Sequence, residues 1–228
     1  MRMSSGDIRT GKEWYAVQTK HYLIMFDEIS RNLVKPRRFA VQAEARLTRI
    51  ASLLGLRKSE GRYAIKGLIP YFVHDPKVLD YGNVEFSGID VPASGKTDDF
   101  YRHEEAHAIL TWAAGEPPAF FNEGFACFAS APNSDVYHRC SLVGFKHGFI
   151  PTLKDIASSD GFWKHYKTYK PFMYWAAGSF MAWALPQRST MRLPGGSFPN
   201  YRANVLTASW WTKNWPRTRA TPGLYAIW

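Results

Sequence analysis

The first half of the chain contains several short apolar segments separated by polar residues, a pattern that predicts strands. These segments combine aromatic and β-branched residues over a few positions and are bounded by polar or turn residues. They are residues 14–18, 21–26, 63–73 and 83–89. Within the third segment, Gly67 and Pro70 predict breaks in the strand, because glycine weakens a strand and proline cannot donate to its ladder.

Helical spacing of apolar residues appears in longer segments. Over residues 36–56 apolar positions recur roughly every three or four residues, and Gly55 predicts the end of this helix. Residues 97–114 contain neither Pro nor Gly, with Thr97 as the predicted N-cap and Gly115 just beyond the end. Further helices are predicted over residues 118–126, 151–156 and 172–185.

This order of elements predicts an α+β fold, in which a small N-terminal mixed β-sheet with a packed helix precedes a mainly helical half. A length of 228 residues fits one domain with an appendage. We assign residues 13–185 to the domain. Residues 186–228 contain four of the nine Trp, five of the 14 Pro and no acidic residue, without periodicity. Our hypothesis is that this tail is not part of the fold.

The predicted helix 97–114 contains the motif H-E-x-x-H at residues 103–107. Two histidines four residues apart lie on one face of a helix, about one turn from each other. His103 and His107 can therefore reach one metal ion from the same side, and Glu104 adjoins the first of them as a candidate general base. The alternative is a surface helix with two solvated histidines.

The next predicted helix supplies a third candidate ligand. Glu123 is a lone carboxylate among phenylalanines that would pack this helix against the preceding one. A buried carboxylate without a partner is costly, and a metal ion would remove that cost. A catalytic zinc has three protein ligands and one open position, so Glu123 is the natural third ligand of a single Zn²⁺.

The motif and the segment P-x-F-x-N-E-G-F-A over residues 118–126 resemble the gluzincin metallopeptidases, with a compact design similar to bacterial peptidase-MA-like proteins. This resemblance implies a zincin-like fold, with His103, His107 and Glu123 as zinc ligands and Glu104 as the base that deprotonates a water. Peptide-bond hydrolysis of a peptide or protein substrate is the implied reaction. Glu105 is expected to point away from the metal.

Residues 174–180, Y-W-A-A-G-S-F, resemble the helix that follows the third ligand in peptidase-MA-like proteins. Tyr174 is therefore a candidate donor to the oxyanion of the reaction. The alternative is a core tyrosine, and His165, Tyr166 and Tyr169 are competing donors. The small residues of this helix are expected to let another helix approach closely.

The resemblance further implies that residues 83–90 form the sheet edge beside the metal, where an extended peptide can pair through main-chain hydrogen bonds. A covered, purely structural strand is the alternative. The chain departs from thermolysin-like members in one respect. Those members place a carboxylate four residues after the ligand glutamate to orient a histidine, but Cys127 occupies this position.

The formal net charge of +10 is unevenly distributed. Residues 186–228 hold six Lys and Arg, whereas residues 1–185 hold 23 against 19 Asp and Glu. Because the body of the protein is nearly balanced, the charge argues against a nucleic-acid-binding face there. Two rival hypotheses remain. One is an inactive or truncated gluzincin that still binds metal, and the other is a nucleic-acid-binding protein that uses the basic tail.

Two cysteines do not make a disulfide framework, and Cys127 is interpreted as a small buried residue. His21 is assigned to strand packing or a solvent-exposed position rather than to the metal. No apolar stretch is long enough to span a bilayer, and no apolar run follows Arg2 as in a secretory signal, so we expect a cytoplasmic protein. No motif for gripping a free N-terminus is evident, which favours an endopeptidase.

Overall fold

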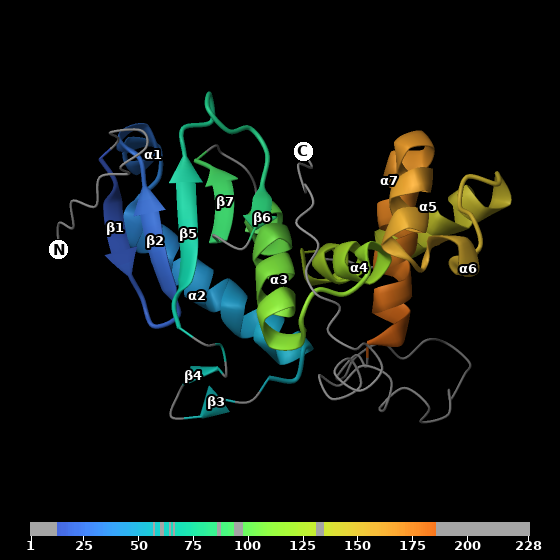
Figure 1. The fold of residues 1–228 in the computed structure, drawn as a ribbon, viewed down its shortest axis with the longest axis horizontal. Coiled ribbons are helices and arrows are strands. Elements are labelled where there is room, and N and C mark those ends of the chain that lie inside the picture. Colours follow the sequence, from blue (N-terminus) through green and yellow to red (C-terminus); the bar gives the residue numbers. More distant parts are fainter. Residues whose placement is uncertain are drawn as a thin grey trace.

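The fold is α+β, as predicted, with a sheet and its helix beside a mainly helical half (Figure 1). The computed structural model describes residues 13–56, 58–59, 62–63, 65, 67–85, 88–93, 98–130 and 135–185. The predicted N-cap Thr97 and the tail 186–228 lie outside these residues. Within the described part of the chain, no helix is both long and apolar enough to cross a membrane.

The N-terminal sheet is mixed, as predicted, and has the strand order β1-β2-β5-β7-β6. The three inner strands run parallel to one another, and each edge strand is antiparallel to its neighbour. The strands are β1 (Tyr15–Gln18), β2 (Tyr22–Phe26), β5 (Ile69–His74), β6 (Asn83–Glu85) and β7 (Gly88–Pro92). A separate two-stranded sheet consists of β3 (Lys58–Ser59) and β4 (Arg62–Tyr63).

One face of the sheet is buried and carries alternate residues of its strands, all of them apolar in β2 and β5. In β2 and β5 the side chains at every second position are fully buried. The helix α2 (Pro36–Leu53) packs there through its apolar stripe, with the Phe39 ring 5.7 Å from that of Phe26 and 5.3 Å from that of Tyr71. The helix predicted over residues 36–56 is thereby confirmed, and Gly55 follows its end with a φ of 67°.

The segment predicted as one strand over residues 83–89 is instead a hairpin of β6 and β7. Of these two strands only β6 lies at an edge of the sheet, because β7 is paired on both sides. The prediction of an edge over residues 83–90 is therefore wrong for β7. Gly88 begins β7 with a φ of 139°, and a Cβ there would collide with the carbonyl oxygen of Pro70. The predicted break at Pro70 is also wrong, because Pro70 lies inside β5 opposite Leu23.

The second half of the fold contains the helices predicted there, and two helices, one in each half of the described chain, were not predicted. The motif helix is α3 (Asp98–Ala114), followed by α4 (Ala119–Ser130), α5 (Asp135–Lys146), α6 (Leu153–Ile156) and α7 (Ser159–Ala184). The predicted helix 172–185 is the C-terminal part of the longer α7. The helices missed were α5 and the short α1 (Glu28–Leu33), which Asp27 caps by accepting from the Ser30 N–H at 2.7 Å.

Close contact between α4 and α7 fixes the position of the third candidate ligand. A Cβ on Gly124 would lie 2.6 Å from the Ala177 carbonyl oxygen, so only glycine permits this separation. A Cβ on Gly178 would lie 3.0 Å from the Cβ of Cys127. The expectation that small residues of α7 allow a close helix contact is confirmed. Further toward its N-terminus α7 is kinked at Tyr169, two residues before Pro171.

Candidate metal centre

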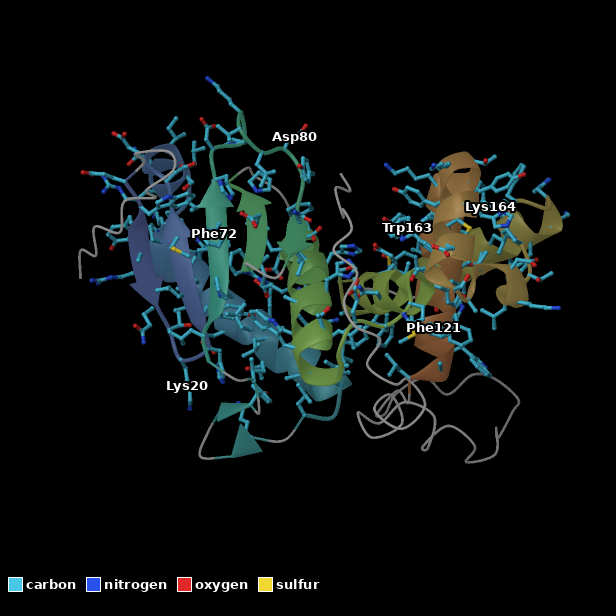
Figure 2. All side chains as sticks on the ribbon, viewed as in Figure 1. Lys20, Phe72, Asp80, Phe121, Trp163 and Lys164 are labelled. Carbon is cyan, nitrogen blue, oxygen red and sulfur yellow. The ribbon has the colours of Figure 1, made fainter. Side chains whose placement is uncertain are left out.

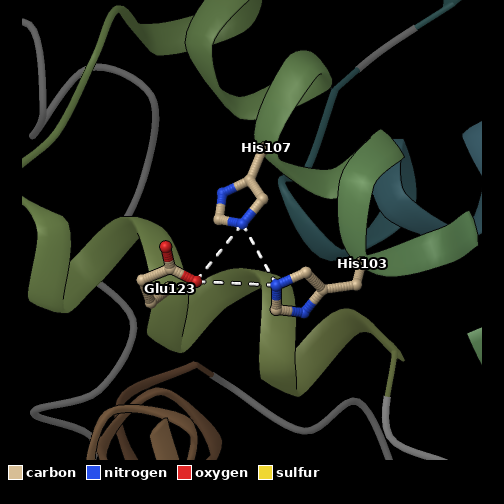
Figure 3. Close-up of side chains that lie close together, drawn as sticks. All are labelled: His103, His107 and Glu123. Atoms are coloured by element: carbon tan, nitrogen blue, oxygen red, sulfur yellow. Dashed lines mark hydrogen bonds and ion pairs between the residues drawn. The ribbon is translucent and has the colours of Figure 1, made fainter. Parts of the chain in front are cut away.

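His103, His107 and Glu123 converge where α3 packs against α4 (Figure 3). The Nε2 atoms of His103 and His107 are 3.2 Å apart. The Oε2 atom of Glu123 lies 3.5 Å from the first of them and 3.4 Å from the second. The helical spacing places both imidazoles on one side of α3, and the close contact of α4 with α7 holds the carboxylate opposite them.

These separations fit a single metal ion. For three ligands held about 2.0–2.1 Å from an ion in tetrahedral geometry, the ligand atoms lie roughly 3.3–3.4 Å from one another. The three distances of 3.2, 3.4 and 3.5 Å bracket this value. Two imidazoles and one carboxylate are a donor set that suits zinc and related transition-metal ions. The site residues present therefore fit a divalent metal.

The electrostatics of the three residues also favour a cation. Burial lowers the pKa of His107, but the Glu123 carboxylate outweighs burial and raises this pKa to about 9. Burial raises the pKa of Glu123, but His107 and His103 outweigh it and lower this pKa to about 2. Without a metal, the centre therefore holds a buried carboxylate that requires a positive charge beside it. A divalent cation meets that requirement in place of a proton.

Asn122 orients one of the histidines. The Nδ1–H of His107 donates to the Oδ1 of Asn122 at 2.8 Å, which leaves the lone pair of Nε2 facing the other two ligand atoms. The sequence left open which group orients a histidine in place of the carboxylate replaced by Cys127. The sequence did contain a signal for this orienting group, because Asn122 immediately precedes Glu123 on the same helix. Its contact with His107, however, depends on how α3 and α4 pack.

Glu104 is 4% exposed and lies close to the ligands. Burial raises the pKa of its carboxyl group, His103 and His107 lower it, and Glu123 raises it, with a net increase. Gly82, just before β6, packs directly on this side chain, and a Cβ at Gly82 would overlap the Glu104 carboxyl group. The loop before the edge strand therefore confines Glu104 beside the histidines.

The structure also places Tyr174 beside the centre. Its ring centroid lies 6.3 Å from that of His103 and 5.4 Å from that of Tyr166. Burial and the nearby Glu123 raise the pKa of Tyr174 far above its usual range, so this hydroxyl keeps its proton. By contrast Tyr169 lies at the kink and its ring is 6.0 Å from Phe149. His165 lies near Asp155.

Three further candidate residues lie apart from the ligand triangle. Cys127 is 5% exposed and burial raises the pKa of its thiol, which agrees with its interpretation as a small buried residue. The ring of His21 bonds to Glu44 at 2.8 Å and accepts from the Tyr63 N–H at 3.2 Å, so it serves strand packing. Glu105 is fully buried against Arg46, with 2.9 Å to Nε and 2.7 Å to Nη2.

No family model, curated protein sequence or solved structure shows significant similarity to this chain.

Proposed function

We propose that this protein is a zinc-dependent peptidase, an endopeptidase in its mode of cleavage. The observation that carries the proposal is the triangle of His103, His107 and Glu123, whose ligand atoms lie 3.2–3.5 Å apart. A buried carboxylate, Glu104, and a buried phenol, Tyr174, adjoin the triangle. The resemblance of residues 103–107 and 118–126 to gluzincin metallopeptidases supports the same reaction.

When bound, the zinc ion supplies Lewis-acid chemistry, polarising the scissile carbonyl and lowering the pKa of a water. Glu104 accepts the proton of that attacking water and returns it to the leaving amine. Its raised pKa favours the first step, because a carboxylate of higher pKa takes up a proton from water more readily. Tyr174 donates its O–H to the substrate oxygen as negative charge develops there.

The remaining residues hold these groups in place. Asn122 keeps the Nδ1–H of His107 engaged, so that Nε2 stays directed at the ligand triangle. Gly82 limits the space available to Glu104. Because these contacts come from different elements, the proposed site depends on the packing of α3 against α4 and the loop before β6, and of α4 against α7.

The first experiment measures metal content by elemental analysis in the purified protein and in His103→Ala, with His147→Ala as the matched control. His147 is an exposed histidine at the end of α5, so its loss should leave the metal content unchanged. We expect one zinc per chain in the wild type and in His147→Ala, and none in His103→Ala. Absence of zinc from the wild type after reconstitution would refute the proposed centre.

Activity requires a separate measurement. Zinc-loaded protein is incubated with a casein-type substrate and with internally quenched peptides, with and without a chelator. We expect cleavage at internal bonds that the chelator abolishes and added zinc restores. Stoichiometric zinc without any cleavage would instead support the rival hypothesis of an inactive metal-binding relative.

A further inference from the structure

Aromatic side chains follow one face of α7 toward the candidate metal centre. The rings of Trp163 and Tyr166 are 5.2 Å apart, and those of Tyr166 and Tyr174 are 5.4 Å apart. Tyr174 in turn lies 6.3 Å from His103. The contacts form a continuous series, which we call the aromatic ladder and define as Trp163, Tyr166 and Tyr174. It joins the N-terminal half of α7 to a metal ligand on α3.

The positively charged side chain of Lys170 lies against this ladder. The Nζ of Lys170 lies 5.5 Å from the centroid of the Tyr166 ring, within the range of a cation–π contact, and the Lys170 side chain is exposed. This contact places Lys170 on the side of α7 that carries Tyr166, across the kink at Tyr169. Residues 159–184 contain three lysines and a single acidic residue, Asp160, which makes this helix positively charged.

The aromatic rings and the lysine of this surface suit different parts of a peptide. Trp163 and Tyr166 are partly exposed, and aromatic rings are enriched where proteins bind peptides and other proteins. An exposed ammonium group attracts a carboxylate and repels another cation, which affects selectivity more than total affinity. An unmodified peptide with an acidic side chain fits both components.

We propose that the aromatic ladder and Lys170 form the substrate-binding face of α7, and that Lys170 selects peptides with an acidic side chain near the scissile bond. This inference rests on the proposed function, because it assumes that the metal centre acts on a peptide. Tyr174 contacts the reacting carbonyl oxygen, whereas Trp163, Tyr166 and Lys170 determine which peptide lies there.

The test measures peptide binding without turnover. Full-length, zinc-loaded Glu104→Gln protein is titrated, by fluorescence anisotropy, into labelled peptides that differ only in one residue, which is Glu, Ala or Lys. Exposed charge pairs contribute about 0.2–1 kcal/mol each, so we expect the Glu peptide to bind roughly fivefold more tightly than the Lys peptide at low salt. This preference should decrease as ionic strength rises, because salt screens exposed charges.

Matched charge reversals assign the preference to one residue. Lys170→Glu should invert the order of the Glu and Lys peptides, whereas Lys164→Glu should leave it unchanged. Lys164 is on the same helix, but Figure 2 labels Trp163 at the edge of α7 facing the sheet and Lys164 at the opposite edge. Trp163→Ala should weaken all three peptides by a similar factor, about fivefold, because it removes aromatic contact area without changing charge.

Equal affinities for the Glu and Lys peptides, or inversion by Lys164→Glu as well, would overturn the proposal. Displacement of the peptides by a short oligonucleotide at equal concentration would overturn it too, because the face would then bind phosphate. The kcat/KM values of the wild type for the same peptides separate this inference from the proposed function. Cleavage without charge preference refutes only the role of Lys170. Charge-selective binding without any cleavage refutes the peptidase activity and leaves this face as a binding site for acidic peptides.

Discussion

The Nδ1 of His107 on α3 lies 2.8 Å from the Oδ1 of Asn122 on α4, so the residue that precedes one candidate ligand orients another. This hydrogen bond couples the two helices of the metal centre. When a metal ion replaces the proton on Nε2, this hydrogen bond holds the other proton of His107 on Nδ1 and so directs the Nε2 lone pair at the metal.

Replacement of Asn122 should therefore weaken metal binding without unfolding the protein. We expect Asn122→Ala to reduce zinc affinity by about 10–100-fold, measured by competition with a chromophoric chelator. Asn122→Asp should restore affinity to at least the wild-type value, because a carboxylate also accepts from Nδ1–H. Asn32→Ala, on exposed α1, is the control. Unchanged affinity in Asn122→Ala would show that His107 is oriented without this hydrogen bond.

Glu104→Gln should separate metal binding from turnover. The glutamine has nearly the same shape, so the buried site beside Gly82 should still accommodate it. We expect the variant to retain one zinc per chain by elemental analysis. Because an amide cannot accept the proton of a water, kcat should fall by about 10²–10⁴-fold. Substantial activity in a zinc-loaded variant would exclude Glu104 as the general base.

The convergence of the three candidate ligands was predictable because their positions depend on local spacing. The interval between His103 and His107 is sufficient to place both imidazoles on one side of any helix. The absence of Pro and Gly from residues 98–114 predicts that helix, and the structure confirms it. Glu123 belongs to a different helix, but as a lone carboxylate among phenylalanines it too has a signature within its own segment.

Other features depend on contacts between distant segments, and the sequence did not reveal them. Gly88 must be glycine because the carbonyl oxygen of Pro70 lies against it, a contact between two strands. Helix α5 was missed because the residues that it buries, Ser141 and Gly144, are small and do not form a stripe of large apolar side chains. Leu142, Val143 and Phe145 are 68%, 51% and 58% exposed, so the expected pattern of buried apolar residues is inverted.

The buried ion pair behind the motif helix gives a prediction about stability. Arg46 on α2 donates to the Oε1 of Glu105 from Nε and Nη2, and also to Asp98 at 2.9 Å. Arg46→Ala would leave the carboxylate of Glu105 buried without its partner. We expect the free energy of unfolding to fall by about 3–5 kcal/mol, measured by urea denaturation.

Two comparisons test this interpretation. Arg49→Ala, on the exposed side of α2, should change the free energy of unfolding by less than about 0.5 kcal/mol. The double variant with Arg46→Met and Glu105→Leu should recover most of the lost stability, because it removes both buried charges. A double variant no more stable than Arg46→Ala would mean that packing of the arginine stem, rather than charge, dominates.

The pair formed by Glu44 and His21 predicts how stability changes with acid. Burial raises the pKa of Glu44, but hydrogen bonds from the side chains of His21 and Thr19 and from the His21 N–H outweigh it and lower this pKa. A carboxyl group whose pKa is lowered by folding stabilises the folded state fully above its unfolded pKa of about 4.5. The contribution is lost as the pH falls through the lower pKa of the folded state.

Glu44→Gln should therefore be less stable than the wild type by up to about 1 kcal/mol at pH 7, since this is a partly exposed pair. The difference between the two proteins should shrink below about pH 4, where Glu44 of the wild type begins to take up its proton. Urea denaturation at several pH values measures both quantities. Glu116→Gln, an exposed position between α3 and α4, is the control. A stability difference that stays constant from pH 7 to pH 3 would show that the charge of Glu44 contributes nothing and that its hydrogen-bonding shape alone matters.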